Sequence, residues 1–94
     1  MWIVAWTKNG YDHKFQIFES EEHAKLYSDE TVELFTSEGW VFTPTNRNIC
    51  HVQGINIQVK ASYTFPLKKV LGCPSHGYLL YGSLQAEPAP KGVE

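Results

Sequence analysis

The run from Ile55 to Phe65 constrains the fold most, because apolar and polar residues alternate strictly along it. Successive side chains of a strand point to opposite faces. The alternation therefore predicts a long antiparallel strand with one face on a core and the other in solvent. The core-facing residues are expected to be Ile55, Ile57, Val59, Ala61, Tyr63 and Phe65. The solvated residues are expected to be Asn56, Gln58, Lys60, Ser62 and Thr64.

The length and composition of the chain predict one folded domain. A chain of 94 residues can build one hydrophobic core, and its 43% hydrophobic and 19% charged residues are typical of a globular protein. The sequence has no apolar run of about 18 residues, and its first residues lack the pattern of a secretory signal. We therefore expect a cytoplasmic protein without a membrane span, whose two cysteines are free thiols.

Two dipeptides predict tight turns. Asn9-Gly10 is typical of a two-residue type I′ turn, which would place Lys8 opposite Tyr11 in a hairpin. In that register Val4 lies opposite Phe15. Gln53-Gly54 predicts a second hairpin, in which one strand directs the Cys50 side chain inward and the His51 side chain outward.

A single amphipathic helix is expected between these hairpins. Ser20 is a suitable N-cap, and Gly39 supplies the left-handed conformation that ends many helices. At about 100° per residue, one face of this helix is predicted to pack on the sheet. That face consists of Ala24, Tyr27, Ser28, Thr31, Leu34 and Phe35.

The order of the elements indicates the fold class. A short strand, Trp40–Thr43, is expected after the helix, and a last strand, Tyr78–Tyr81, is expected to stop at Gly82. We predict an α+β domain of two layers over residues 1–84, with an antiparallel sheet of about five to six strands and one helix on one face. Residues 85–94 are expected to form a flexible tail.

Acidic residues are concentrated on the predicted helix. Seven of the ten carboxylates of the chain lie between Glu19 and Glu38, where the only lysine or arginine is Lys25. A rigid acidic face can dock on the basic surface of a partner protein, although a solvated helix face is also commonly charged for solubility alone. The residues expected to contact the partner are Glu22, Asp29, Glu30 and Glu33.

Metal binding and catalysis are weaker alternatives. Cys50, Cys73 and His76 could contribute to a zinc site in a small nucleic-acid-binding domain, but neighbouring strand residues such as Cys50 and His51 point to opposite faces. We therefore expect no cofactor. A hydrolase built on Cys73 and His76 is the enzymatic alternative, and no oxyanion hole or orienting third residue accompanies that pair. Nucleic acid is an unlikely partner because the chain has a single arginine, Arg47, and an acidic helix.

The N-terminal part of the chain resembles a class of small proteins. Its Asn9-Gly10 turn leads into a helix that opens at Phe18–Ala24 and ends at Gly39-Trp40. This arrangement resembles the compact proteins encoded in phage and mobile-element accessory regions, and the resemblance implies a binder or inhibitor. We expect a non-enzymatic protein-binding module, with a structural or homo-oligomeric domain that pairs through a sheet edge as the alternative.

Overall fold

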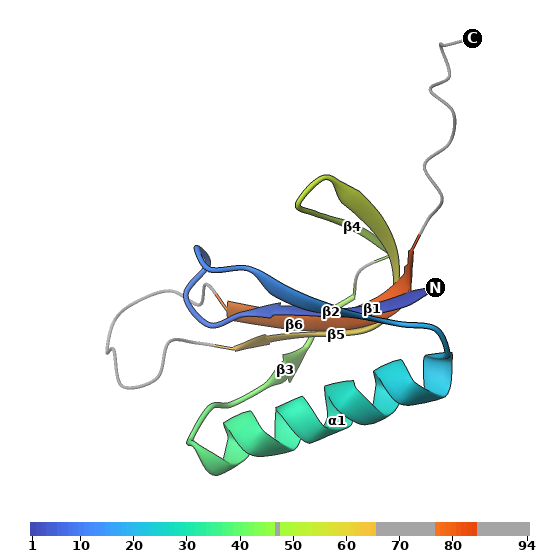
Figure 1. Cartoon of the computed structure of the whole chain (residues 1–94). Coiled ribbons are helices and arrows are strands. Elements are labelled where there is room, and N and C mark those ends of the chain that lie inside the picture. The colour runs from blue at the N-terminus through green and yellow to red at the C-terminus, as the bar shows by residue number, and fades with distance from the viewer. Residues whose placement is uncertain (47, 66–76, 85–94) are drawn as a thin grey trace, which may run out of the picture.

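The computed structural model describes residues 1–46, 48–65 and 77–84. Within these residues the chain forms one α-helix and six β-strands (Figure 1). The elements in chain order are β1 (Trp2–Thr7), β2 (Lys14–Phe18), α1 (Glu21–Ser37), β3 (Thr43–Pro44), β4 (Ile49–Val52), β5 (Ile55–Phe65) and β6 (Gly77–Leu84). The predicted tail, residues 85–94, lies outside the described residues.

The strands form one antiparallel sheet in the order β2-β1-β6-β5-β3. Strands β3 and β4 both pair with the edge of β5 that faces away from β6: β4 pairs with the first half of β5 and β3 with its end. The helix α1 crosses one face of this sheet, whereas β4 rises on the opposite side (Figure 1). This architecture confirms the predicted α+β domain with one helix on one face. No helix in the described part of the chain is long and apolar enough to cross a membrane.

Strand β5 contributes to both faces of the sheet, which corrects the prediction of a single core-facing side. The register with β6 shifts between Val59 and Ala61, so that Lys60 is an extra residue in the ladder. Before the shift, Ile57 packs in a cluster on the β4 side; after it, Phe65 packs against aromatic rings on the α1 side. Ser62, predicted to be solvated, is consequently buried. A bulge of this kind changes the face on which every later side chain lies.

Gly82 lies inside β6 and does not end it, contrary to the prediction. It pairs with Val59 at the register shift of β5. A Cβ atom on Gly82 would lie 2.0 Å from the backbone oxygen of Gln58, so a larger residue would displace the neighbouring strand. Glycine at this position therefore permits the close backbone approach that accompanies the bulge.

The first hairpin has a longer connection than the sequence predicted. Gly10 has a φ of 85°, but Asn9 does not have a positive φ, as a type I′ turn would require. Oδ1 of Asn9 instead accepts hydrogen bonds from the backbone of Tyr11 and Asp12. The ladder consequently pairs Ala5, rather than Val4, with Phe15. The predicted register is therefore wrong by one residue.

The second hairpin is confirmed. Gln53 and Gly54 have φ angles of 51° and 82°, the two successive positive values that a type I′ turn needs. Cys50 pairs with Ile57 and is buried, while His51 is exposed. The two-residue loop fixes the register between β4 and β5. The Cys50 side chain therefore points inward and the His51 side chain outward, as predicted.

Helix α1 begins and ends where the sequence indicated. The Ser20 hydroxyl accepts a hydrogen bond from the backbone N–H of His23, and Gly39 has a φ of 99°. Ala24 and Phe35 are buried against the sheet. The prediction that Leu34 packs on the sheet is wrong, because Leu34 is exposed at the side of the helix. The next residue, Phe35, fills the space against Trp6 instead.

A second cluster of buried residues lies on the side away from α1. Val52 of β4 and Leu80 of β6 pack there with Ile3 of β1. Because β5 and β6 separate β4 from β1 in the strand order, these contacts require β4 to curl over the sheet. Both faces of the central strands are therefore covered, one by α1 and the other by β4 (Figure 1).

Candidate functional site

The predicted acidic residues share the outward side of α1. Glu22, Asp29, Glu30 and Glu33 are all exposed, as expected of the face opposite Ala24. Their spacing places them on neighbouring turns of one helix. The helix itself is held by its buried side, so its outer carboxylates are displayed on a rigid element.

An apolar side chain lies at the centre of these carboxylates. Leu26 follows Glu22 by four residues and precedes Glu30 by four, and this spacing places neighbours on one helix surface. Its side chain is 55% exposed, so it does not contribute to the core. We call Leu26 together with its four acidic neighbours the acidic helix surface. The sequence prediction named the four carboxylates but missed Leu26, although its i, i+4 relation to them is visible in the sequence.

Few described cations neutralise this surface. Lys25 lies beside it and its Nζ is 3.4 Å from Oδ2 of Asp29. Both side chains are largely exposed, so this ion pair is screened by water and contributes little to stability. Glu22, Glu30 and Glu33 have no ion pair with another described residue.

A groove of about 360 Å³ runs along the helix next to the acidic helix surface. Glu30 and Leu34 lie on its helix side, and Trp6 lies on the sheet. At the C-terminal end of the helix, Nζ of Lys8 is 3.3 Å from Oε1 of Glu38 and 4.5 Å from the centre of the Phe35 ring. The groove extends the apolar area that a partner could reach from Leu26.

The strand β2 forms one edge of the sheet. It pairs with β1 on one side only, among the described residues. Phe15 and Ile17 are 41% and 39% exposed and lie on the sheet face opposite α1. An edge strand with exposed apolar residues can pair with another strand.

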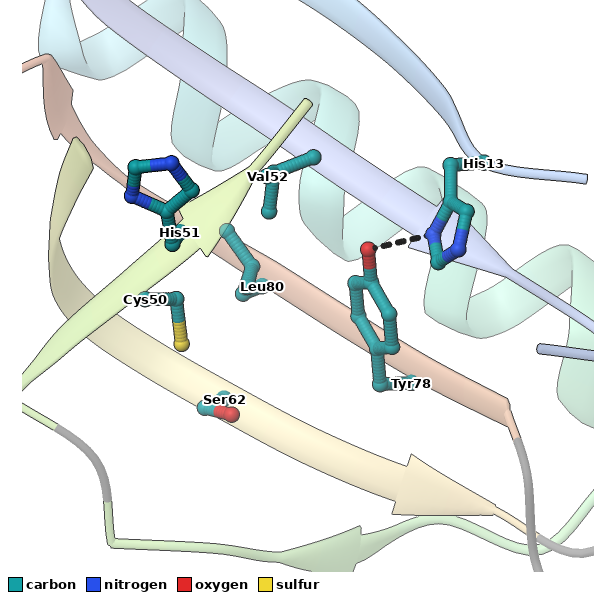
Figure 2. Close-up of a pocket in the computed structure, with 7 residues that line it drawn as sticks. All are labelled: His13, Cys50, His51, Val52, Ser62, Tyr78 and Leu80. Atoms are coloured by element: carbon teal, nitrogen blue, oxygen red, sulfur yellow. Dashed lines mark hydrogen bonds between the residues drawn. The ribbon is translucent and has the colours of Figure 1, made fainter. Parts of the chain in front are cut away.

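A pocket of about 130 Å³ lies between β4 and the sheet. Figure 2 shows Cys50 and Ser62 at one end of it and the His13–Tyr78 pair at the other, with Leu80 between them. A hydrogen bond of 2.9 Å joins Nδ1 of His13 to Oη of Tyr78. His13 can reach β6 because the loop before β2 is longer than predicted.

The residues proposed for zinc are only partly described. The Cys50 side chain is buried, and His51 points away from it (Figure 2). A hydrogen bond joins Nδ1 of His51 to Oδ1 of Asn56. No group of three or more His, Cys, Asp or Glu side chains in residues 1–46, 48–65 and 77–84 could hold a metal ion. Cys73 and His76, which the zinc and hydrolase alternatives require, lie outside the described residues.

Burial raises the pKa of the Tyr81 phenol, and the nearby carboxylate of Glu21 raises it further. Tyr81 is in β6 and packs with Val4 and Ala24 beneath α1. A phenol surrounded by apolar groups and carboxylates stays protonated, so it acts here as a neutral core residue.

Comparisons of the chain with family models, with curated proteins and with solved structures gave no match.

Proposed function

We propose that the protein is a non-enzymatic, cytoplasmic protein-binding module that docks the acidic helix surface on the basic surface of a partner. Its role would be that of a phage-type inhibitor or regulator. The observation that carries this proposal is the exposure of Leu26 at the centre of Glu22, Asp29, Glu30 and Glu33.

Such a surface has the composition of a small binding site. A few well-packed residues near the centre of an interface, which lose contact with water on binding, contribute most of the binding energy. Charged residues at the rim contribute less affinity, but they accelerate association and exclude partners of the same charge. The partner is therefore expected to present an apolar depression for Leu26, with lysine or arginine side chains around it.

Affinity capture with matched variants tests the proposal. The protein is used to capture partners from extracts of its source cell, and the double variant Glu30→Lys and Glu33→Lys is compared with the wild type. A control variant, Asp12→Lys with Glu19→Lys, makes the same change in net charge at exposed positions outside the acidic helix surface. We expect the helix variant to lose the captured protein and the control to keep it.

Leu26→Ala separates a specific interface from general charge attraction. This variant leaves every carboxylate in place, so attraction by charge alone would be unchanged. We expect it to weaken binding of the purified partner at least about tenfold, as truncation of a central interface residue does. Capture that survives both the charge reversal and Leu26→Ala would contradict the proposal.

Self-association through β2 is a second candidate, favoured by the exposed Phe15 and Ile17. When two copies of β2 pair in antiparallel fashion about Gln16, Phe15 of one copy lies opposite Ile17 of the other. Size-exclusion chromatography with light scattering would detect this dimer. Ile17→Lys should convert it to a monomer without changing capture by the acidic helix surface, and a wild type that is monomeric at high concentration would exclude it.

A further inference from the structure

We infer that the pocket beneath β4 binds a small uncharged compound with one aromatic ring and one hydroxyl group, of the phenol class. The pocket is lined by His13, Cys50, His51, Val52, Ser62, Tyr78 and Leu80. It lies on the sheet face opposite α1, so the inference does not depend on the role of the acidic helix surface (Figure 2).

The hydroxyl of Ser62 identifies the polar end of the pocket. Ser62 is 6% exposed, and its Oγ has no hydrogen-bond partner among the described residues. A buried hydroxyl without a partner is costly, because it has lost its hydrogen bonds to water. Oγ is itself covered in this conformation, so the Ser62 side chain has to turn about its Cα–Cβ bond to meet a ligand hydroxyl in the pocket. The hydrogen bond formed in this way would remove the cost.

The walls of the pocket suit a single ring. Val52 and Leu80, both buried, supply an apolar surface between the Ser62 end and the His13 end. At the far end, the rings of His13 and Tyr78 lie 5.7 Å apart at 35°, with their hydrogen bond fixing their orientation. Aromatic walls favour a flat ligand that can pack against ring faces and edges.

The volume of the pocket is larger than one water molecule needs and smaller than a drug-sized ligand needs. The volume is about 130 Å³. One buried water needs about 10–15 Å³, whereas pockets for drug-sized ligands have about 300–1,000 Å³. A compound with a single six-membered ring and one polar substituent lies between these limits.

The chemistry of the lining residues indicates a ligand without charge. None of the seven is Lys, Arg, Asp or Glu. A carboxylate or ammonium group entering the pocket would lose much of its hydration and meet no Lys, Arg, Asp or Glu among the described lining residues. A neutral hydroxyl loses less hydration free energy, and it can form a hydrogen bond with the Ser62 hydroxyl.

Titrations monitored by ¹⁵N NMR test this inference, with phenol, benzoate and toluene as the probes. We expect phenol to shift the amide signals of Cys50, Ser62 and Leu80 in a saturable manner. Toluene lacks the hydroxyl and benzoate carries a charge, so each should bind at least about fivefold more weakly, the equivalent of roughly one hydrogen bond. Benzoate binding as tightly as phenol would overturn the inference.

Ser62→Ala provides the decisive variant, and Ser83→Ala is its matched control. Ser83 lies on the adjacent strand β6, pairs with Trp2 and faces the α1 side of the sheet. We expect Ser62→Ala to weaken phenol binding about fivefold and Ser83→Ala to leave it unchanged. The inference fails if the wild type shows no saturable shift, or if Ser62→Ala binds phenol as tightly as the wild type.

Discussion

The two sides of the sheet are packed in different ways. The α1 side is filled by aromatic rings, and the centre of the Phe65 ring lies 4.8 Å from that of Phe42, 5.3 Å from that of Trp40 and 5.9 Å from that of Phe35. The β4 side is built mainly from aliphatic residues, and it retains a pocket and a hydroxyl without a described partner. The difference indicates that aromatic rings pack around Phe65 on the α1 side, whereas smaller side chains leave a pocket between β4 and the sheet.

This difference arises from the element that covers each side. A 17-residue helix spans the sheet and brings Ala24 and Phe35 against it. The four-residue strand β4 is short, and its alternating side chains place only Cys50 and Val52 toward the sheet. Two inward side chains cannot fill the space that a helix face fills, which explains the pocket beneath β4.

The largest expected effect comes from the aromatic side. Phe65→Ala removes a fully buried ring that packs with three others, and we expect the free energy of unfolding to fall by about 3–5 kcal/mol. Phe15→Ala is the matched control, because Phe15 is 41% exposed on β2. Its effect should be under about 1 kcal/mol. Urea unfolding followed by circular dichroism measures both, and equal losses would show that the Phe65 ring is no more tightly packed than the exposed Phe15 ring.

Gly82→Ala tests the bulge in β5, which moves the later side chains of the strand from one side of the sheet to the other. The added methyl group would lie 2.0 Å from the backbone oxygen of Gln58, so β5 and β6 would have to separate at the bulge. We expect a loss of about 1–3 kcal/mol in the free energy of unfolding. Gly54→Ala provides a contrast, because a Cβ there meets no atom within 4 Å and only the φ of 82° opposes it. If Gly82→Ala costs less than Gly54→Ala, the close approach at the bulge is not what requires glycine.

Local signals in the sequence predicted the elements that depend on a few neighbouring residues. The Ser20 cap, the Gly39 helix end and the Gln53-Gly54 turn are each fixed by backbone conformation and hydrogen bonds within a short segment. The exposure of the four acidic residues followed from helix periodicity in the same way. The fold class then followed from the order of these elements.

The features that the sequence did not reveal depend on distant contacts. The alternation in Ile55–Phe65 continues unchanged through Lys60, yet the bulge sends Ile57 to one side of the sheet and Phe65 to the other. A pattern of apolar residues at every second position is the same whether the strand serves one core or two. The sequence did not predict the pocket for this reason. Ser62 would be solvated in a regular strand, and it is buried in the strand with the bulge.

Two of the buried hydroxyl groups provide a finer comparison of the sides. Beneath α1, the Thr31 hydroxyl donates to the backbone oxygen of Tyr27 at 2.8 Å, whereas Oγ of Ser62 has no described partner. We expect Thr31→Val to lower the free energy of unfolding by about 1 kcal/mol and Ser62→Ala to raise it by about 1 kcal/mol. Urea unfolding without added ligand measures both. A loss of stability in Ser62→Ala would show that the hydroxyl is satisfied in solution and would weaken the case for a ligand there.

The smallest expected effect concerns the titration of Tyr81 on the α1 side. Burial, and after it the Glu21 carboxylate, raises the pKa of this phenol above the usual 10.0. The unfolded chain therefore loses the phenol proton at a lower pH than the folded chain, so the contribution to stability is complete below pH 10 and is lost as the pH rises through the folded-state pKa. Between pH 9 and 11 the wild type should lose stability more steeply than Tyr81→Phe, which keeps the ring but cannot ionise. Because the other tyrosines and the lysines titrate in both proteins, the difference between the two urea-unfolding curves isolates Tyr81, and parallel curves would mean that its phenol ionises as readily in the folded state as in the unfolded one.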